Sequence, residues 1–145
     1  MCNKKNIFMI ITITVMIIFV INFKIIFVDG QSMSPTLKNK QAMFVFKNSH
    51  SYDKNSIIVF DTLDYDVCVK RIIASGGDTV KLKDGNIYVN DIHISPYSCD
   101  TALEQIYTLT DNQYFVIGDN FNASIDSRMY GPIRLNDIIG KVIYF

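Results

Sequence analysis

An uncharged run of eighteen residues near the N-terminus is the feature that most constrains how this chain folds. The run extends from Asn6 to Phe23, is rich in isoleucine and phenylalanine, and lies between the basic residues Lys5 and Lys24. As a helix it would be roughly 27 Å long, close to the thickness of a bilayer core. The sequence therefore predicts a single transmembrane anchor, and the rest of the chain has to fold beside a membrane.

The charges beside this run indicate its orientation. The lysine pair before it favours the cytoplasm, because short segments rich in lysine and arginine stay on that side. We therefore expect residues 1–5 to be cytoplasmic, residues 6–24 to form the anchor, and residues 25–145 to fold outside as one domain. Lys24 would snorkel to the interface from the helix end. A cleavable signal peptide is the alternative, but residues 23–28 contain none of the small residues that a processing site requires.

The charge balance of the external part argues against nucleic-acid binding. The whole chain has 14 basic and 14 acidic residues, and three of the lysines lie in or beside the anchor, which holds no acid. Residues 25–145 therefore carry 11 basic and 14 acidic residues. A slightly acidic domain without a basic cluster is a poor partner for nucleic acid.

Cysteines and histidines give little sign of a bound group. Cys68 and Cys99 both fall outside the predicted membrane segment, where a disulfide between them is possible, but two thiols fit the sequence at least as well. His50 and His93 have no neighbouring acid or cysteine at metal-ligand spacing. We expect no metal and no cofactor.

The external part has the pattern of a mainly β domain. Val80 to Ile94 alternates between apolar and polar residues and is interrupted by Asp84-Gly85 and Asn90-Asp91, which predict tight hairpin turns. Residues 96–112 lack clear periodicity and predict a surface loop. Further strands are expected where β-branched and aromatic residues gather, over residues 42–46, 56–60, 67–73, 114–117 and 138–145.

A serine and a lysine indicate chemistry close to the outer membrane surface. Ser32 follows the anchor in a short polar run, and Lys70 lies in a stretch of valines and isoleucines that predicts a buried strand. A lysine with its ordinary pKa of about 10.4 is protonated at neutral pH. Burial among apolar side chains disfavours the ammonium form, so a neutral Lys70 amine would be able to take the proton of a serine nucleophile. The pair suggests a membrane-bound serine protease.

Four blocks of the sequence stand out by their order and spacing. They are Ser32-Met33-Ser34-Pro35-Thr36-Leu37, the strand Asn55–Phe60, Lys70-Arg71-Ile72-Ile73 followed by Gly76-Gly77-Asp78, and Gly118-Asp119-Asn120 running into Ser124-Ile125-Asp126-Ser127-Arg128. Together with the single preceding anchor, these blocks resemble bacterial type I signal peptidases, specifically the Gram-positive type, and the likeness covers essentially the whole chain. It implies the coiled β-sheet fold shared by signal peptidases and SOS repressors, preceded by one transmembrane helix.

The resemblance implies a Ser–Lys dyad that works without histidine or an acid relay. Ser32 would be the nucleophile and Lys70 the general base. The Ser124 hydroxyl would hydrogen-bond the Lys70 amine and orient it. The remaining polar residues of these blocks would form a supporting framework: Asp119, Asp126 and Arg128, with Arg71 as the partner of one of the acids.

Three departures from the family pattern affect loops near the dyad. Gly30 stands where some members have a serine that contributes to the oxyanion hole, which leaves the Ser32 N–H as one donor and the second donor unnamed. Phe121 stands where the family usually has arginine. Ala74-Ser75-Gly76 replaces its usual Gly-x-Pro. These departures bear on loop geometry more than on the dyad itself.

By the same resemblance, the substrates would be secreted preproteins that are cut after a small-residue motif, usually Ala-x-Ala. An extended substrate would add as a strand to an exposed sheet edge. Cys68 would face the same way as Lys70, because side chains alternate along a strand. With Met33, it would line the pocket for the residue before the cut. The alternative is that both are ordinary core residues.

Other functions fit parts of the sequence. A self-cleaving repressor shares the dyad, but it carries a DNA-binding domain where this chain has an anchor. A non-catalytic, membrane-tethered β domain conflicts with the intact Ser32, Lys70 and Ser124, although Phe121 favours it. The sequence does not distinguish general secretion from a dedicated peptidase for a few substrates, such as pilin-like proteins, and it is silent on oligomeric state.

Overall fold

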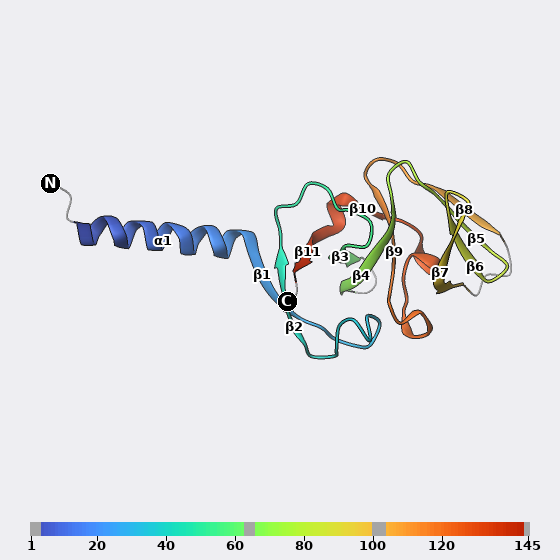
Figure 1. Cartoon of the computed structure of the whole chain (residues 1–145), viewed down its shortest axis with the longest axis horizontal. Helices are drawn as coiled ribbons and strands as arrows, with labels where there is room; N and C mark the ends of the chain where they lie inside the picture. Colours follow the sequence, from blue (N-terminus) through green and yellow to red (C-terminus); the bar gives the residue numbers. More distant parts are fainter. Residues whose placement is uncertain (1–3, 63–65, 100–103, 144–145) are drawn as a thin grey trace.

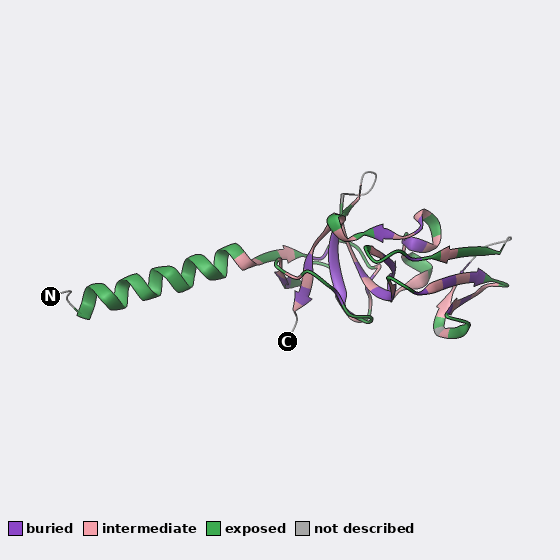
Figure 2. Cartoon of the chain, turned by 90° about the horizontal axis from the view of Figure 1, so that it is seen from above, coloured by how far each residue is buried: buried purple, intermediate pink, exposed green. Residues whose placement is uncertain are grey.

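A single apolar helix projects from a body of β-strands (Figure 1). The computed structural model describes residues 4–62, 66–99 and 104–143. Helix α1 covers Lys4–Asn22 and none of its residues is buried (Figure 2). In the described part of the chain, it is the one helix long and apolar enough to cross a membrane. A signal sequence would satisfy the same criterion, so the helix is a candidate anchor.

The helix runs directly into the first strand, without a linker. Strand β1 is Phe23–Phe27 and pairs antiparallel with β2, Ala42–Phe46. The predicted anchor extended to Lys24, but the helix ends at Asn22, so the last two predicted anchor residues belong to β1. Lys24 is therefore an exposed strand residue and does not lie at a helix end.

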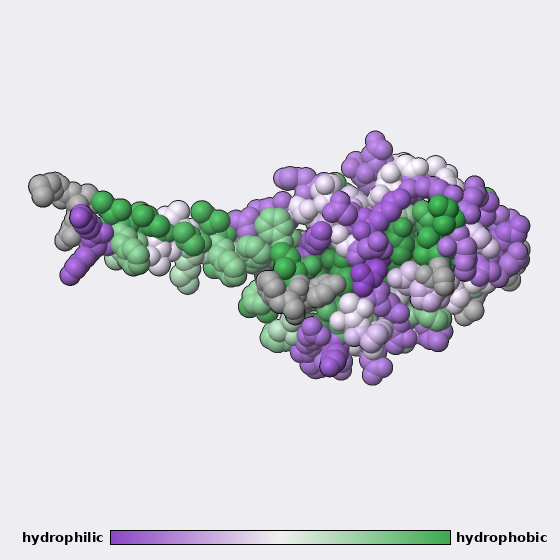
Figure 3. Space-filling view, in the orientation of Figure 1, coloured by the Kyte–Doolittle hydropathy of each residue, from purple (hydrophilic) through white to green (hydrophobic). Residues whose placement is uncertain are grey.

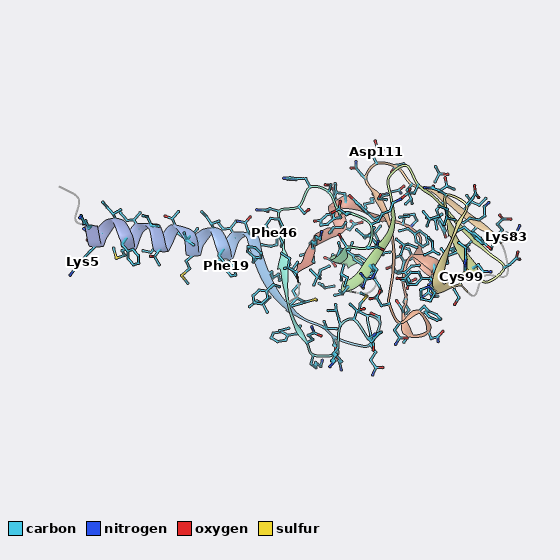
Figure 4. All side chains as sticks on the ribbon, viewed as in Figure 1. Lys5, Phe19, Phe46, Lys83, Cys99 and Asp111 are labelled. Carbon is cyan, nitrogen blue, oxygen red and sulfur yellow. The ribbon has the colours of Figure 1, made fainter. Side chains whose placement is uncertain are left out.

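Aromatic contacts explain why the helix stops where it does. The Phe23 ring stacks on Phe19 of α1 at 4.8 Å and packs against Phe46 of β2 at 5.3 Å between ring centroids. Figure 4 labels Phe19 and Phe46 on the two sides of this junction. The Asn22 carbonyl accepts a hydrogen bond from the Lys47 N–H at 2.8 Å. Because strand pairing satisfies the backbone here, β1 replaces another turn of helix.

The large sheet contains seven antiparallel strands in the order β1-β2-β11-β3-β4-β9-β10. Its centre is β3, where every residue from Ile57 to Phe60 is buried. Since successive side chains point to opposite faces, Ile57 and Val59 pack into one apolar cluster, and Ile58 and Phe60 pack into another. The other strands are β3 Ile57–Thr62, β4 Asp66–Ser75, β9 Gln113–Ile117, β10 Ile133–Arg134 and β11 Ile138–Ile143.

The small sheet has four antiparallel strands in the order β7-β6-β5-β8 and lies at the end of the body away from α1 (Figure 1). Both predicted hairpin turns are confirmed, because Asp84, Gly85, Asn90 and Asp91 all have positive φ, between 50° and 77°. The sheet packs its apolar face against the end of β9. Its strands are β5 Thr79–Lys83, β6 Asn86–Val89, β7 Ile92–Ser98 and β8 Gln105–Thr108.

The mainly β prediction is confirmed, but the predicted surface loop over residues 96–112 is wrong. Strand β7 continues to Ser98, and β8 pairs with β5 along its whole length. Tyr107 of β8 packs its ring against Phe115 at 5.4 Å between ring centroids, which holds this short strand to the core. Residues 100–103 of the predicted loop and residues 144–145 of the last predicted strand lie outside the described residues. The sequence did not predict strand β10 or the short helix α2, Ser127–Tyr130.

Candidate active site

Ser32 lies in a compact turn between β1 and β2, and apolar side chains hold that turn in place. Met33 and Leu37 are 1% and 0% exposed, so both are buried in the core beneath the turn. The Leu37 N–H donates to the Met33 carbonyl at 2.9 Å. Where the turn returns to the sheet, Val28 and Lys40 are joined by a hydrogen bond of 2.7 Å. We call residues 28–40 the nucleophile turn.

Lys70 reaches Ser32 from strand β4, 38 residues further along the chain. Lys70 pairs with Ile58 of β3 in the sheet and is 5% exposed. Its Nζ donates to Ser32 Oγ at 2.9 Å and to the Val69 carbonyl at 3.1 Å. The structure therefore brings together the two residues that the sequence singled out as nucleophile and base.

The surroundings of Lys70 favour the neutral amine. Burial lowers the pKa of Lys70, because the ammonium form loses its hydration there, and the nearby Arg128 cation also lowers it. Cys68 and Asp126 act in the opposite direction, but the net shift is downward. A lysine with a lowered pKa can accept the proton of a hydroxyl that it contacts.

Ser124 does not form the predicted hydrogen bond to the Lys70 amine. Its Oγ is buried and has no hydrogen-bond partner among the described residues. The side chain lies against Gly118, where an added Cβ would sit 2.6 Å from both the Ser124 Cβ and the Ser32 carbonyl oxygen. Ser124 is thus close to the nucleophile turn. Its hydroxyl occupies the space that a side chain at position 118 would need.

Arg71 and Asp119 form the first part of the polar framework. The Arg71 guanidinium donates two hydrogen bonds to the Asp119 carboxylate, from Nε to Oδ1 at 2.8 Å and from Nη2 to Oδ2 at 2.6 Å. A third bond joins Arg71 Nη1 to the Asn55 carbonyl at 2.8 Å. Asp119 is therefore the acid that Arg71 pairs with, and the bond ties the end of β9 to β4.

Asp126 and Arg128 form the second part. Asp126 is fully buried and accepts hydrogen bonds from Arg128 Nε at 2.7 Å, Arg128 Nη2 at 2.8 Å and the Gly118 N–H at 3.0 Å. Arg128 also donates to the carbonyl of Phe121 at 2.9 Å and to that of Ser98 at 2.7 Å. This ion pair fixes the segment 118–128, which we call the support loop, and attaches it to the small sheet.

Asn120 was not predicted to have a role at the site. Its N–H donates to the Ser32 carbonyl at 2.9 Å, and its Nδ2 donates to the Gln31 carbonyl at 3.2 Å. These two bonds join the support loop to the backbone of the nucleophile. The Gly-Asp-Asn block was visible in the sequence, but nothing in its spacing indicated which segment Asn120 would contact.

The backbone around the nucleophile leaves one oxyanion donor accessible. Among the described residues, the Ser32 N–H has no hydrogen-bond acceptor. Gly30 has a φ of +93°, and its N–H donates to Asn39 Oδ1 at 3.1 Å. The Gly30 N–H is therefore engaged within the turn, which leaves the Ser32 N–H as the donor supported by geometry.

A groove leads to Ser32 and Lys70, and we call it the active-site groove. One wall is formed by residues 26–33 and the other by residues 67–70. Met33 and Cys68 both border it, next to the dyad, as the substrate-pocket hypothesis expected. Cys68 borders the groove, whereas Cys99 is buried in the core of the small sheet. The structure therefore gives no support to a disulfide between them.

Two unpaired strand edges form the walls of this groove. Among the described residues, β4 pairs with β9 from Arg71 onward, and the stretch before Arg71 pairs with β3 alone. In the same part of the chain, β1 is the outermost strand of the large sheet and pairs with β2 alone. Such edges present backbone donors and acceptors to any extended chain that lies between them.

A buried lysine amine that contacts a serine hydroxyl, beside a groove open to an extended chain, defines the protein as a serine endopeptidase. The sequence model of the family described as signal peptidase, peptidase S26, matches residues 3–145. The chain therefore belongs to the signal peptidase family.

Curated relatives agree with this assignment. Signal peptidase I V of Bacillus subtilis is 33% identical over 135 residues, which cover 79% of this chain and 80% of the relative. Signal peptidase I of Bacillus caldolyticus is 34% identical over 137 residues, covering 79% and 74%. Thylakoidal processing peptidase 1 of Arabidopsis thaliana is 32% identical over 138 residues, covering 81% of this chain but 40% of that longer protein.

A solved structure supports the fold. The crystal structure of a signal peptidase I from Enterococcus faecalis aligns with a TM-score of 0.51 at 24% sequence identity. The alignment covers 64% of this chain and 97% of that one. The likeness confirms the β architecture described above.

Proposed function

We propose that this chain removes signal peptides from secreted preproteins as a type I signal peptidase, with Ser32 as nucleophile and Lys70 as general base. The observation that carries the proposal is the 2.9 Å hydrogen bond between Lys70 Nζ and Ser32 Oγ at the end of the active-site groove. This pairing, together with the lowered pKa of Lys70, argues against a non-catalytic β domain.

The reaction follows from this contact. The neutral Lys70 amine takes the proton of Ser32 while Oγ attacks the scissile carbonyl, and the Ser32 N–H stabilises the oxygen that becomes negative. The resulting ammonium gives its proton to the leaving amine, which frees the mature protein and leaves an acyl-serine. Lys70 then takes a proton from a water molecule, which attacks the ester, and returns that proton to Ser32 Oγ as the signal peptide is released.

Ser124 keeps a proposed orienting role. Its buried hydroxyl makes no hydrogen bond in this structure, and an unsatisfied buried hydroxyl costs about 1–3 kcal/mol. A rearrangement on substrate binding that paired it with the Lys70 amine would therefore be favoured. Asp119 and Asp126, held by Arg71 and Arg128, would keep the support loop in position meanwhile.

The groove accounts for a preference for small residues. A substrate strand would lie between the open edges of β1 and β4, bonded through its backbone. Met33 and Cys68 flank the dyad, where the side chain that precedes the cut would lie. We propose that this restricts the substrate to small residues at that position, of the Ala-x-Ala type.

The membrane position is part of the proposal. Lys4 and Lys5 mark the hydrophilic end of an otherwise hydrophobic helix, which supports a cytoplasmic N-terminus and an external domain (Figure 3). On the face of β1 and β2 away from the core, Ile25, Phe27 and Phe44 are 54%, 66% and 39% exposed. An apolar face that continues from the helix would rest on the bilayer surface, next to the emerging cleavage site.

The proposal is tested with the full-length protein in detergent and a purified preprotein. Ser32→Ala and Lys70→Ala should each lower cleavage by more than about 10³-fold, because dyad members act as a unit. Ser34→Ala is the matched control, since it removes a second serine from the same turn, and it should cleave normally. An active Ser32→Ala together with an inactive Ser34→Ala would show that the nucleophile is misassigned. Circular dichroism of each variant confirms that the domain is folded.

A further inference from the structure

We propose that the support loop, together with the adjoining Met129 of α2, carries a binding surface for the first residues of the mature protein, those that follow the cut, and that this surface favours apolar side chains. The proposal rests on the signal peptidase function and extends it, because it assigns substrate contacts on the far side of the scissile bond. The surface consists of Phe121, Ile125 and Met129, which we call the apolar shelf.

The shelf is a hollow bordered by apolar side chains that no other described part of the chain covers. Ile125 and Met129 are 46% and 74% exposed, and Phe121 is half-buried beside them. Ser124 and Arg128 border the same hollow. Single exposed apolar residues are common on protein surfaces, but three around one hollow, next to an active site, are typical of a binding surface.

The shelf and the active-site groove are separate surfaces that share no lining residue. The groove is formed by residues 26–33 and 67–70, and the shelf by residues 121–129 with Ser98. Asn120, next to Phe121, donates its N–H to the Ser32 carbonyl, so the shelf begins one residue from a contact with the nucleophile. In Figure 1, the loops that follow β1 and β9 project from the same side of the body, with the loop after β9 further from α1.

The direction of the substrate decides which part of it meets the shelf. A signal peptide precedes the cut, is apolar and enters from the membrane, so its last residues reach Ser32 along the groove that begins at β1. The residues after the cut then leave past Ser32, away from α1, and the shelf is the surface beyond that point. An extended chain advances about 3.3 Å per residue, so the first three residues would span roughly 10 Å.

The shelf is held rigid before any substrate binds. Arg128 Nη2 donates to the carbonyls of Phe121 and Ser124 at 2.9 and 3.2 Å, while its Nη1 bonds the Ser98 carbonyl at 2.7 Å. The buried Asp126 fixes the guanidinium in turn. A surface that is ordered in advance loses little conformational entropy on binding, so even a few apolar contacts there affect the rate of cleavage.

Matched peptides test the shelf. Three peptides share one sequence up to the cut and carry leucine, serine or aspartate at both the first and second positions after it. Wild-type protein should cleave the leucine peptide several-fold better in kcat/KM than the other two. The double variant Ile125→Ser with Met129→Ser should reduce that ratio towards one, mainly through the leucine peptide. Phe121→Arg should move the preference towards the aspartate peptide.

Controls separate the shelf from general effects. Ile106→Ser removes an apolar side chain that is 58% exposed on the small sheet, and it should leave all three rates unchanged. Met129→Ser alone should also lower the ratio of kcat/KM for the leucine peptide to that for the other two. The test therefore does not depend on correct folding of the double variant. A ratio near one in wild type, or a full ratio in the shelf variants, would refute the shelf while leaving the peptidase intact. Wild-type protein that cleaves no peptide would refute the proposed function itself.

Discussion

The nucleophile turn and the support loop meet at Ser32, yet they are held by different forces. The turn is fixed by apolar side chains, since Met33 and Leu37 are buried beneath it. The support loop is fixed by charge, through the buried Asp126 and the two hydrogen bonds from Arg128. Apolar packing tolerates substitutions of similar volume, whereas a buried ion pair fails when either partner is lost. The difference indicates that the two sides of one site should respond differently to mutation.

The largest effect is expected in the support loop. Arg128→Met leaves the Asp126 carboxylate buried without its partner, which should lower the free energy of unfolding by about 3–5 kcal/mol. Urea unfolding followed by circular dichroism measures this. The matched control is Asp53→Asn, which breaks an exposed pair with Lys141 at 3.7 Å and should change stability by less than about 0.5 kcal/mol. Equal effects of the two variants would contradict the special role of the buried pair.

A somewhat smaller effect is expected in the nucleophile turn. Leu37→Ala removes a fully buried side chain and should lower the free energy of unfolding by about 2–5 kcal/mol. Leu37→Met keeps the volume and should lower it by less than about 1.5 kcal/mol, with cleavage preserved. No such rescue is expected for Arg128→Lys, because an ammonium cannot reproduce the bonds of the guanidinium fork. If Arg128→Lys were as stable as Leu37→Met, the contrast between the two segments would be wrong.

Asn120 connects the two segments and should show a moderate effect. Asn120→Ala removes the Nδ2 bond to the Gln31 carbonyl and keeps the backbone bond to Ser32. One such bond contributes about 1 kcal/mol, which corresponds to roughly fivefold in kcat. Because Asn120 positions the Ser32 backbone, kcat should fall while KM stays nearly constant, as steady-state kinetics would report. Asn136→Ala, an exposed asparagine elsewhere, serves as control. A rise in KM alone would indicate substrate contact instead.

The smallest expected effect is a change in the pH profile. The active form carries a neutral Lys70, so kcat/KM should fall as the pH drops through the pKa of that amine. Burial lowers this pKa, so the acidic limb should lie well below the ordinary lysine value of about 10.4. The negative charge of a Cys68 thiolate raises the pKa of Lys70, and Cys68→Ser, which does not carry that charge, should therefore move the limb to lower pH. If the acidic limb of Cys68→Ser moved to higher pH, Cys68 would not be a residue that raises the pKa of Lys70.

The elements predicted well from the sequence are those with local causes. Asp84-Gly85 and Asn90-Asp91 adopt the positive φ values that a tight hairpin requires, so their positions alone predicted the small-sheet hairpins. Strand β3 was recognisable because four consecutive apolar residues suit a strand that is buried on both faces. Ser32 and Lys70 were predicted from their blocks, and the structure places their side chains in contact.

The elements predicted poorly depend on partners distant in the sequence. Strand β1 continues the apolar composition of the anchor, and pairing with β2 alone distinguishes it from helix. Strand β8 has one exposed face and no clear alternation, so its pairing with β5 was invisible. The contacts of Ser124 and Asn120 depend on how the support loop folds around Gly118, which spacing does not encode.

The direct junction between α1 and β1 has a mechanical consequence. Nine residues separate Asn22 from Ser32, five of them in a paired strand about 17 Å long, and the Phe23 ring packs between Phe19 and Phe46. With α1 in the bilayer, the nucleophile therefore stands at a fixed height above the lipid. This height sets the distance between the lipid surface and the point of cleavage. The point at which a preprotein is cut then depends on how far its chain has emerged from the membrane, as well as on the residues around the bond.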